Sequence, residues 1–287
     1  MSIEFKEINY TYGAGTAFET QVLRNLSFKI EHGEFVGLIG HTGSGKSTLI
    51  QHMNGLLKAD SGQVLFHGQN IYADGYKMKE LRSHVGLVFQ YPEYQLFEST
   101  VLEDVCFGPK NLGLSKEEIL SRAKVALAHV GMGEEVFDKS PFDLSGGQKR
   151  RVAIAGVLAM RPEILILDEP ASGLDPAGRD EILHTIRRLH DEYEMTVVLV
   201  SHSMDDVAEY VDRILVINEG SVMLDGTPRE VFSRYKELEA IGLAAPSMTY
   251  LAQELREKGL DIPADILTID EAEEAILQAF GKAGEEK

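Results

Sequence analysis

The sequence predicts an α/β fold built on a mostly parallel β-sheet, with antiparallel strands at its N-terminal end. Short apolar segments alternate with helical segments along most of the chain. Uninterrupted apolar runs of this length are typical of parallel strands that helices cover on both faces. A longer, mainly helical stretch interrupts the alternation near the middle, and further helical segments follow it at the C-terminal end.

The predicted strands are of two kinds. Alternating apolar and polar residues indicate strands at Ile3–Tyr12 and 22–30. Uninterrupted apolar residues indicate buried strands at Phe35–Ile39, 164–167 and Thr196–Val200. Further short strands are expected near residues 62–66, 84–89 and 213–217.

Helices are predicted between these strands, at residues 46–54, 180–191 and 203–211. From about residue 100 to residue 131 the chain becomes mainly helical. One helix there begins with Ser115 as N-cap and Glu118 as its capping-box partner. The apolar residues that share one face of this helix are Ile119, Ala123, Ala126, Leu127 and Val130. We therefore predict a helical subdomain at about residues 92–160, inserted between two parts of the sheet domain.

The end of the chain predicts a second unit. Residues 1–231 form the predicted main domain, and residues 232–287 form a C-terminal helical extension with breaks at Pro246 and Pro263. This extension carries twelve acidic and six basic residues, so a solvated acidic tail is the simpler alternative.

Composition limits the partners. The net charge of −18 argues against binding nucleic acid by charge alone, because that needs clustered Lys and Arg, and we expect no nucleic-acid partner.

Cys106 is the single cysteine and is expected to be a small apolar residue on a helix, not a catalytic thiol. We expect no signal peptide. The longest uncharged apolar run, residues 152–160, is shorter than the roughly 20 residues that span a bilayer. A membrane role would therefore require another subunit.

Residues 40–47 read GHTGSGKS and satisfy the phosphate-loop pattern G-x-x-x-x-G-K-[ST] between a buried strand and a helix. Glycines let backbone N–H groups turn toward phosphate oxygens, and the helix N-terminus adds partial positive charge. The chain should therefore have a P-loop NTPase fold and bind ATP with Mg²⁺. Lys46 should reach the β- and γ-phosphates, and the Ser47 hydroxyl should bind the metal. The residues predicted to contact ATP here are Gly40, His41, Thr42, Gly43, Ser44, Gly45, Lys46, Ser47 and Thr48.

Two carboxylates follow the apolar run at residues 164–167. Asp168, at the end of a buried strand, can bind Mg²⁺ directly or through water. Glu169 would be the general base for the attacking water. Adjacent carboxylates are common on solvated turns, but their position after a buried strand and downstream of a phosphate loop favours catalysis.

Residues 144–148 read LSGGQ, and here the sequence resembles the ATP-binding cassette (ABC) family. The resemblance covers about residues 3–232. It implies that Ser145, Gly146, Gly147 and Gln148 face the γ-phosphate of a nucleotide held by a second cassette. Two cassettes would then enclose two nucleotides, so one isolated chain should hydrolyse ATP poorly.

The same resemblance implies further site residues. Gln90 matches the Q-loop glutamine, which senses Mg²⁺ or the lytic water and counts as both a catalytic and a metal residue. His202 matches the switch histidine that reaches the γ-phosphate. Asp175 belongs to the D-loop at residues 172–175, and Tyr12 matches the aromatic residue that stacks on adenine. Tyr10, two residues away, and a purely structural role for Tyr12 remain alternatives.

Residues 90–97, 101–105 and 107–111, together with 40–45 and 149–156, resemble the ATPase subunits of energy-coupling factor (ECF) transporters, and among these the second, A-prime type. Such transporters import vitamins and transition metals into prokaryotic cells. The resemblance implies a peripheral location on the cytoplasmic face of the cell membrane. It implies three partners: a different second ATPase, a transmembrane coupling subunit and a separate substrate-capture subunit. It also implies that the C-terminal extension is a dimerisation domain.

An acidic cluster follows Gln90, and we consider two interpretations of it. Its members, Glu93, Glu98, Glu103 and Asp104, would accept arginines from coupling helices of the transmembrane partner if the segment forms a groove. An ordinary solvated face explains the same residues equally well.

Other functions stay open at this point. A homodimeric ATPase of a cobalt or nickel importer is the nearest alternative. Soluble ABC proteins of translation or DNA repair usually carry two cassettes or a long coiled-coil insertion, and this sequence has neither. A nucleotide sensor without catalysis would be expected to lack Glu169 or His202, and both are present. The transported substrate is not indicated by any residue.

Overall fold

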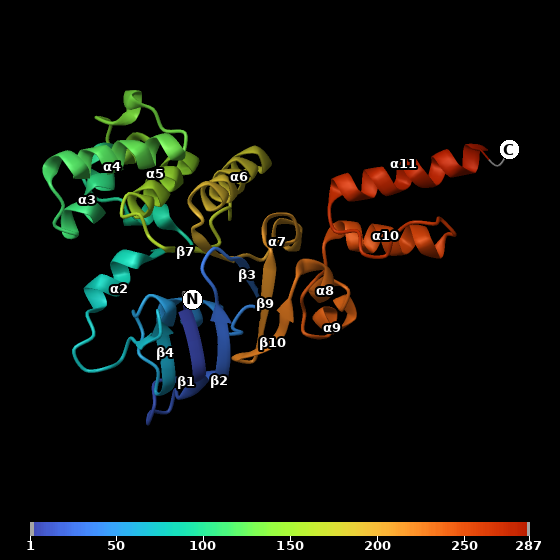
Figure 1. Ribbon diagram of the computed structural model, residues 1–287, viewed down its shortest axis with the longest axis horizontal. Helices are drawn as coiled ribbons and strands as arrows, with labels where there is room; N and C mark the ends of the chain where they lie inside the picture. Colours follow the sequence, from blue (N-terminus) through green and yellow to red (C-terminus); the bar gives the residue numbers. More distant parts are fainter. Residues whose placement is uncertain (1–2, 286–287) are drawn as a thin grey trace.

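The computed structural model describes residues 3–285 and contains two β-sheets with helices around them (Figure 1). The strands, in chain order, are β1 (Ile3–Tyr12), β2 (Thr20–Ile30), β3 (Phe35–Ile39), β4 (Ser61–Phe66), β5 (Gln69–Asn70), β6 (Val85–Val88), β7 (Ile164–Asp168), β8 (Thr196–Val200), β9 (Arg213–Asn218) and β10 (Ser221–Gly226). The helices are α1 (Lys46–Met53), α2 (Met78–His84), α3 (Val101–Asn111), α4 (Lys116–His129), α5 (Gly146–Leu158), α6 (Pro176–Tyr193), α7 (Met204–Tyr210), α8 (Pro228–Phe232), α9 (Tyr235–Ala240), α10 (Ser247–Glu257) and α11 (Ile269–Glu285). Short 3₁₀ segments are η1 (Pro92–Gln95), η2 (Glu134–Val136) and η3 (Pro141–Asp143).

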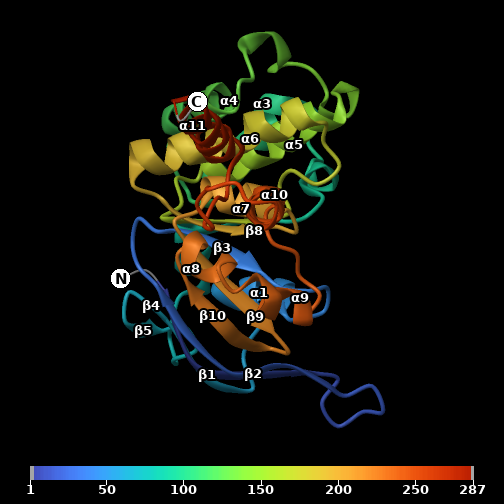
Figure 2. The same ribbon diagram turned by 90° about the vertical axis from the view of Figure 1, so that its right-hand side faces the viewer.

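The two sheets confirm the predicted fold class. Strands β2, β1, β4 and β5 pair antiparallel in that order. The larger sheet has the order β10-β9-β3-β8-β7-β6, and its strands are parallel except β10 at the edge. In Figure 2 the antiparallel sheet lies below, the parallel sheet in the middle and helices α3 to α6 above.

The strand β10 was not predicted, because its residues lack a clear pattern: of its six residues only Leu224 is buried. A tight turn creates it. Glu219 and Gly220 both have positive φ, 47° and 79°, which is the backbone that joins two antiparallel strands most directly. A side chain at Gly220 would also collide with the carbonyl oxygen of Val22, so the turn needs glycine on two counts.

Strand β3 shows why the apolar runs are uninterrupted. Phe35 and Ile39 pack into the core on the side of the helical subdomain. Val36 and Leu38 pack into a second core between the two sheets, together with Leu49 of α1. A strand that is buried on both faces has no position for a polar side chain, so each of its residues is apolar or glycine.

The helices α3, α4 and α5 lie between β6 and β7 along the chain, as the inserted subdomain requires (Figure 1). The Ser115 hydroxyl accepts from the backbone N–H of Glu118 at 3.2 Å, which confirms the N-cap. The reciprocal half of the capping box is wrong, because the Glu118 carboxylate binds Arg122, one turn further along, instead. Cys106 is buried in α3, where burial raises the pKa of its thiol.

The C-terminal segment packs in two parts. Phe232 and Leu238 are fully buried in the core on the helical-subdomain side of the parallel sheet. After Ala245 the chain forms a separate small core between α10 and α11, which includes Ala252 and Ala275 (Figure 1, right). Pro246 is the N-cap of α10. The small core between α10 and α11 therefore begins after Pro246, while the chain from Phe232 to Ala245 packs on the main core.

Within residues 3–285, no helix combines the length and the apolar character that crossing a bilayer requires.

Replacing Phe232 should test how far the main core extends. We expect Phe232→Ala to lower the free energy of unfolding by about 3–5 kcal/mol, because it leaves a cavity in a fully buried site. The matched control is Phe280→Ala on α11, whose ring is 65% exposed and whose loss should cost less than about 0.5 kcal/mol. Urea denaturation of the isolated chain measures both. Equal losses would show that Phe232 is not part of the main core.

Candidate active site

The phosphate loop lies between β3 and α1, as predicted. Its backbone depends on glycine at two places. Gly45 has φ 109°, a conformation that other residues rarely adopt. Any side chain at Gly40 would collide with the carbonyl oxygen of Ile217 in the neighbouring strand β9. The loop is therefore packed closely against the sheet at the end of β3.

Lys46 is buried at the first position of α1. Its Nζ donates to the carbonyl oxygens of Gly40 at 2.6 Å and His41 at 3.1 Å. Burial lowers the pKa of Lys46, and the charges of Glu169 and Asp168 oppose this effect. The loop thus holds a cation inside itself, and two carboxylates stand close enough to act on it.

Asp168 is the last residue of β7, and Glu169 follows it. Both side chains are largely buried. Burial raises the pKa of Asp168, with Lys46 opposing. Burial, and then the Asp168 charge, raises the pKa of Glu169 to about 7. At neutral pH this carboxyl group can both take and release a proton, which a general base requires.

The backbone of Glu169 has φ 53°, a left-handed conformation that is uncommon for residues with side chains. Its N–H donates to the carbonyl oxygen of Val200 at 3.0 Å, so the neighbouring strand β8 holds it in place. His202, two residues beyond the end of β8, places its Nε2 at 3.5 Å from Glu169 Oε1. Burial, and then the Lys46 charge, lowers the pKa of this imidazole.

Two buried oxygens in this region have no hydrogen-bond partner among the described residues: Ser44 Oγ and Glu169 Oε1. Buried polar atoms are rarely left in this state. A buried lysine, a run of turned amides and two carboxylates are the groups that a phosphate with a divalent cation would satisfy. The site therefore fits Mg-ATP: Lys46 and the loop amides suit the phosphates, and Ser47 and Asp168 suit the metal.

The remaining predicted residues lie around this centre. The Tyr12 hydroxyl is 3.3 Å from Thr48 Oγ1, and the Tyr12 ring is 41% exposed at the end of β1, edge-on to Tyr10. An exposed ring beside the phosphate-loop helix is placed as an adenine platform would be. Gln90 lies in a bend after β6, exposed and without a hydrogen bond to any described residue. Strand β6 pairs with β7 in the register Val88–Leu167, so Gln90 leaves the sheet at the same edge as Asp168 and Glu169, and its role stays a prediction.

The signature residues form a surface of their own. Ser145 caps α5 in a complete capping box with Gln148. Asp175 is the N-cap of α6, where its carboxylate accepts from the N–H of Gly178 at 3.2 Å. Ser145, Gly147 and Asp175 line one hollow of about 440 Å³, and no phosphate-loop residue lines it. In this chain the signature hollow and the phosphate loop thus share no lining residue.

Three comparisons bear on this geometry. A model of the ABC transporter family matches residues 23–172. An energy-coupling factor transporter ATP-binding protein, EcfA2, from Caldanaerobacter subterraneus subsp. tengcongensis is 56% identical over 278 residues, covering 97% of each chain. The structure of cbiO1 from Clostridium perfringens, part of the ABC transporter complex cbiONQ, has a TM-score of 0.74 at 40% identity, covering 88% of this chain and 98% of that one.

A dimeric structure of the ATP-binding cassette MJ0796, bound to ADP and Pi, has a TM-score of 0.70 at 31% identity, covering 78% of this chain and 98% of that one. The chain belongs to the ABC transporter family. The resemblance to ECF transporter ATPases drawn from the residues after Gln90 is confirmed by the EcfA2 relative.

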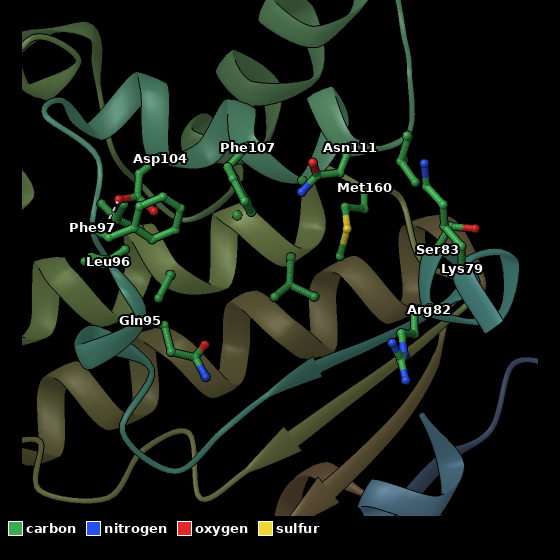
Figure 3. Close-up of a pocket in the computed structure, with 16 residues that line it drawn as sticks. Lys79, Arg82, Ser83, Gln95, Leu96, Phe97, Asp104, Phe107, Asn111 and Met160 are labelled. Carbon is green, nitrogen blue, oxygen red and sulfur yellow. Dashed lines mark hydrogen bonds between the residues drawn. The ribbon is translucent and has the colours of Figure 1, made fainter. Parts of the chain in front are cut away.

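This ABC ATPase has a further feature away from the phosphate loop, a groove of about 470 Å³ between α2 and the helical subdomain (Figure 3). Its walls carry the aromatic rings of Phe97 and Phe107, 57% and 41% exposed, whose centroids are 4.8 Å apart. Gly156 and Met160 line the floor near the end of α5. The groove is mainly apolar, and none of the predicted ATP-contacting residues lines it.

Two members of the predicted acidic cluster, Glu93 and Asp104, are not free carboxylates, whereas Glu98 is half-buried and Glu103 is exposed. Glu93 is bound to Arg150, and only 18% of its side chain is exposed. Asp104 is buried and accepts from the N–H groups of Phe97 and Glu98 at 2.9 Å (Figure 3). Both carboxylates satisfy partners inside the chain, because each lies where water cannot reach it freely.

Arg150 is the functional candidate that we did not single out from the sequence. It is the middle residue of the basic run Lys149-Arg150-Arg151, which directly follows the signature. A basic run usually lies in solvent, but Arg150 is 4% exposed. The helical period could have indicated that Arg150 is buried, since it shares a helix face with the buried residues Ala153 and Ile154.

The raised pKa of Glu169 makes the stability of the nucleotide-free chain depend on pH. The folded carboxyl keeps its proton up to about pH 7, compared with an ordinary value of 4.5. Because the folded state binds more protons in this window, the free energy of unfolding falls as pH rises through it, by up to about 3 kcal/mol. Glu169→Gln cannot titrate and should lose less stability between pH 5 and pH 8 in urea titrations.

The control is Glu117→Gln, which removes an exposed carboxylate on α4 and should follow the wild type. If the wild type and Glu169→Gln lose the same stability over this pH range, the raised pKa of Glu169 is refuted.

Proposed function

We propose that this chain is the ATP-hydrolysing subunit of an ECF-type importer, which powers uptake of vitamins or other micronutrients, transition metals included. The observation that carries the hydrolytic part is Glu169: a buried carboxyl with a pKa of about 7, beside Lys46 and 3.5 Å from His202. The EcfA2 relative, similar along nearly its whole length, supports the transport part.

Bound Mg-ATP would supply the γ-phosphoryl group and the metal charge that stabilises its transfer to water. The chain's own residues do the rest. Lys46 releases the loop carbonyls and binds phosphate oxygens. Asp168 and Ser47 hold the metal. Glu169 would accept a proton from the attacking water, and His202, whose Nε2 lies 3.5 Å from Glu169 Oε1, would bind the γ-phosphate.

The second half of the site is proposed to come from another cassette. The signature hollow and the phosphate loop are separate in this chain, so each lacks half of the groups that would enclose a nucleotide. The dimeric MJ0796 structure supports two cassettes acting together. The A-prime resemblance favours a related but different ATPase, hence a heterodimer, and the α10–α11 pair is its proposed dimerisation domain.

A transmembrane coupling subunit is the proposed occupant of the apolar groove (Figure 3). The groove presents Phe97 and Phe107 to solvent, and exposed aromatic pairs of this kind are common anchor points at interfaces. This contact would place the chain peripherally on the cytoplasmic face of the cell membrane. A separate membrane subunit that captures the substrate would join through the coupling subunit.

The homodimeric importer ATPase remains the second candidate, favoured by the likeness to cbiO1 of the complex cbiONQ. Sedimentation of the purified chain with ATP, alone and with a second cassette protein, separates the two candidates. Dimerisation of the chain alone would favour the homodimer.

Glu169→Gln tests the catalytic role directly. Without the base, the steady-state ATPase rate of the assembled complex should fall about 10²-fold or more, while ATP binding stays intact. Turnover is measured by phosphate release and binding by nucleotide retention. Glu163→Gln is the matched control, since Glu163 lies just before the opposite end of β7 and binds His67 and His84 instead. Full turnover in Glu169→Gln would remove this residue as the base.

The groove is tested by removing one of its rings. Phe97→Ala should strongly reduce co-purification with the transmembrane subunit, because anchor residues at interfaces commonly contribute about 2 kcal/mol or more. ATP binding should not change. Phe18→Ala is the control: its ring is 87% exposed in the loop between β1 and β2. Equal co-purification of Phe97→Ala and wild type would exclude the groove as the docking site.

A further inference from the structure

Arg150 connects two parts of the chain that are distant in sequence. Its guanidinium lies within 3.3–3.4 Å of both carboxylate oxygens of Glu93, in η1. Its Nη1 donates to the carbonyl oxygen of Pro170 at 3.1 Å and also to that of Ser172. All these acceptors surround a side chain that is 4% exposed.

Each end of this connection leads to a functional part of the molecule. Glu93 lies two residues before Gln95, where the chain begins to line the groove. Pro170 and Ser172 follow Glu169 by one and three residues, and the Ser172 N–H donates to the Glu169 carbonyl oxygen at 3.2 Å. Arg150 itself belongs to α5, which begins at the signature and also lines the groove with Val152 and Ala153.

The chemistry requires arginine. A buried cation is tolerated only when every donor finds an acceptor, and here the acceptors lie in two directions. The planar, forked guanidinium can bind a carboxylate on one edge and carbonyl oxygens on another, whereas an ammonium group is a point donor on a flexible stem. A shift of η1 therefore pulls on Arg150, and Arg150 in turn holds Pro170 and Ser172.

We propose that Arg150 is a positioning residue for hydrolysis, one that couples the occupant of the groove to the placement of Glu169 and of Asp175 in the D-loop. This inference rests on the proposed function. Arg150 touches neither the nucleotide groups nor the Glu169 side chain. It acts on the segment between Glu169 and Asp175, so that docking against η1 changes how well the base is aligned. Glu93 is accordingly an internal partner and not a receptor for an external arginine.

The test uses the whole chain assembled with its partner cassette and transmembrane subunit, and compares Arg150→Lys with wild type. The variant keeps the positive charge but loses the planar, forked guanidinium group. Its kcat for ATP should fall about tenfold or more, because small displacements of a catalytic group have effects of this size. Its KM for ATP and its melting temperature should stay at the wild-type values, since the phosphate loop is untouched.

Glu93→Gln weakens the same set of hydrogen bonds at its η1 end. It also provides a second test should Arg150→Lys fail to fold. It should also lower kcat without changing KM. The double variant should be no slower than the slower single variant, because both changes break one connection. The matched control is Arg122→Lys, a half-buried arginine of the same subdomain that binds Glu118 and the Met160 carbonyl oxygen, and it should turn over normally.

Wild-type kcat in both Arg150→Lys and Glu93→Gln would overturn the inference. Equal losses in Arg150→Lys and Arg122→Lys, with lowered melting temperatures, would overturn it too and leave Arg150 a purely structural residue. Failure of the proposed function has a different signature: the wild-type chain would not assemble with a transmembrane subunit, or the assembled wild type would not hydrolyse ATP.

Discussion

Two carboxylates at the end of a buried strand set the constraint on which the rest of this structure depends. Asp168 and Glu169 carry charge where water is scarce, and their mutual repulsion adds to the cost of burial. The protein tolerates them because Lys46 lies within reach of both charges. Three features keep these groups together: the glycines of the loop, the left-handed backbone at Glu169, and the hydrogen bond from the Glu169 N–H to the Val200 carbonyl oxygen.

The parallel sheet is what makes this assembly possible. Strands β3, β8 and β7 are neighbours in the sheet and run in the same direction, so their carboxyl ends meet at one edge. The phosphate loop follows β3, His202 follows β8 and Glu169 follows β7. Residues separated by more than 150 positions thus converge because the strands that carry them are hydrogen-bonded side by side.

The local sequence pattern was sufficient to predict the strands and the phosphate loop, but not which side chains pair with each other. Uninterrupted apolar runs located β3, β7 and β8, because strands buried on both faces leave no other choice. The phosphate loop was evident because its spacing is tied to its chemistry. Glu118 shows the limit: a capping box and an ion pair with Arg122 compete for one carboxylate, and only the folded geometry decides between them. The Arg150–Glu93 pair joins residues 57 positions apart, and no periodicity records such a pairing.

The charges around Lys46 and Glu169 explain why an isolated chain should hydrolyse ATP poorly. Lys46 is occupied by the carbonyl oxygens of Gly40 and His41, so it is not extended toward a phosphate. Glu169, with a pKa of about 7, is only partly ionised at neutral pH and so only partly available as a base. Added positive charge near Glu169 would lower its pKa, and phosphate oxygens would draw Lys46 out of the loop. The surface around Ser145 lines a separate hollow in this chain, which supports the proposal that a partner cassette encloses the phosphate from the other side. On this view, activation requires added positive charge near Glu169 and phosphate near Lys46, while the strands β3, β7 and β8 already hold these residues in position.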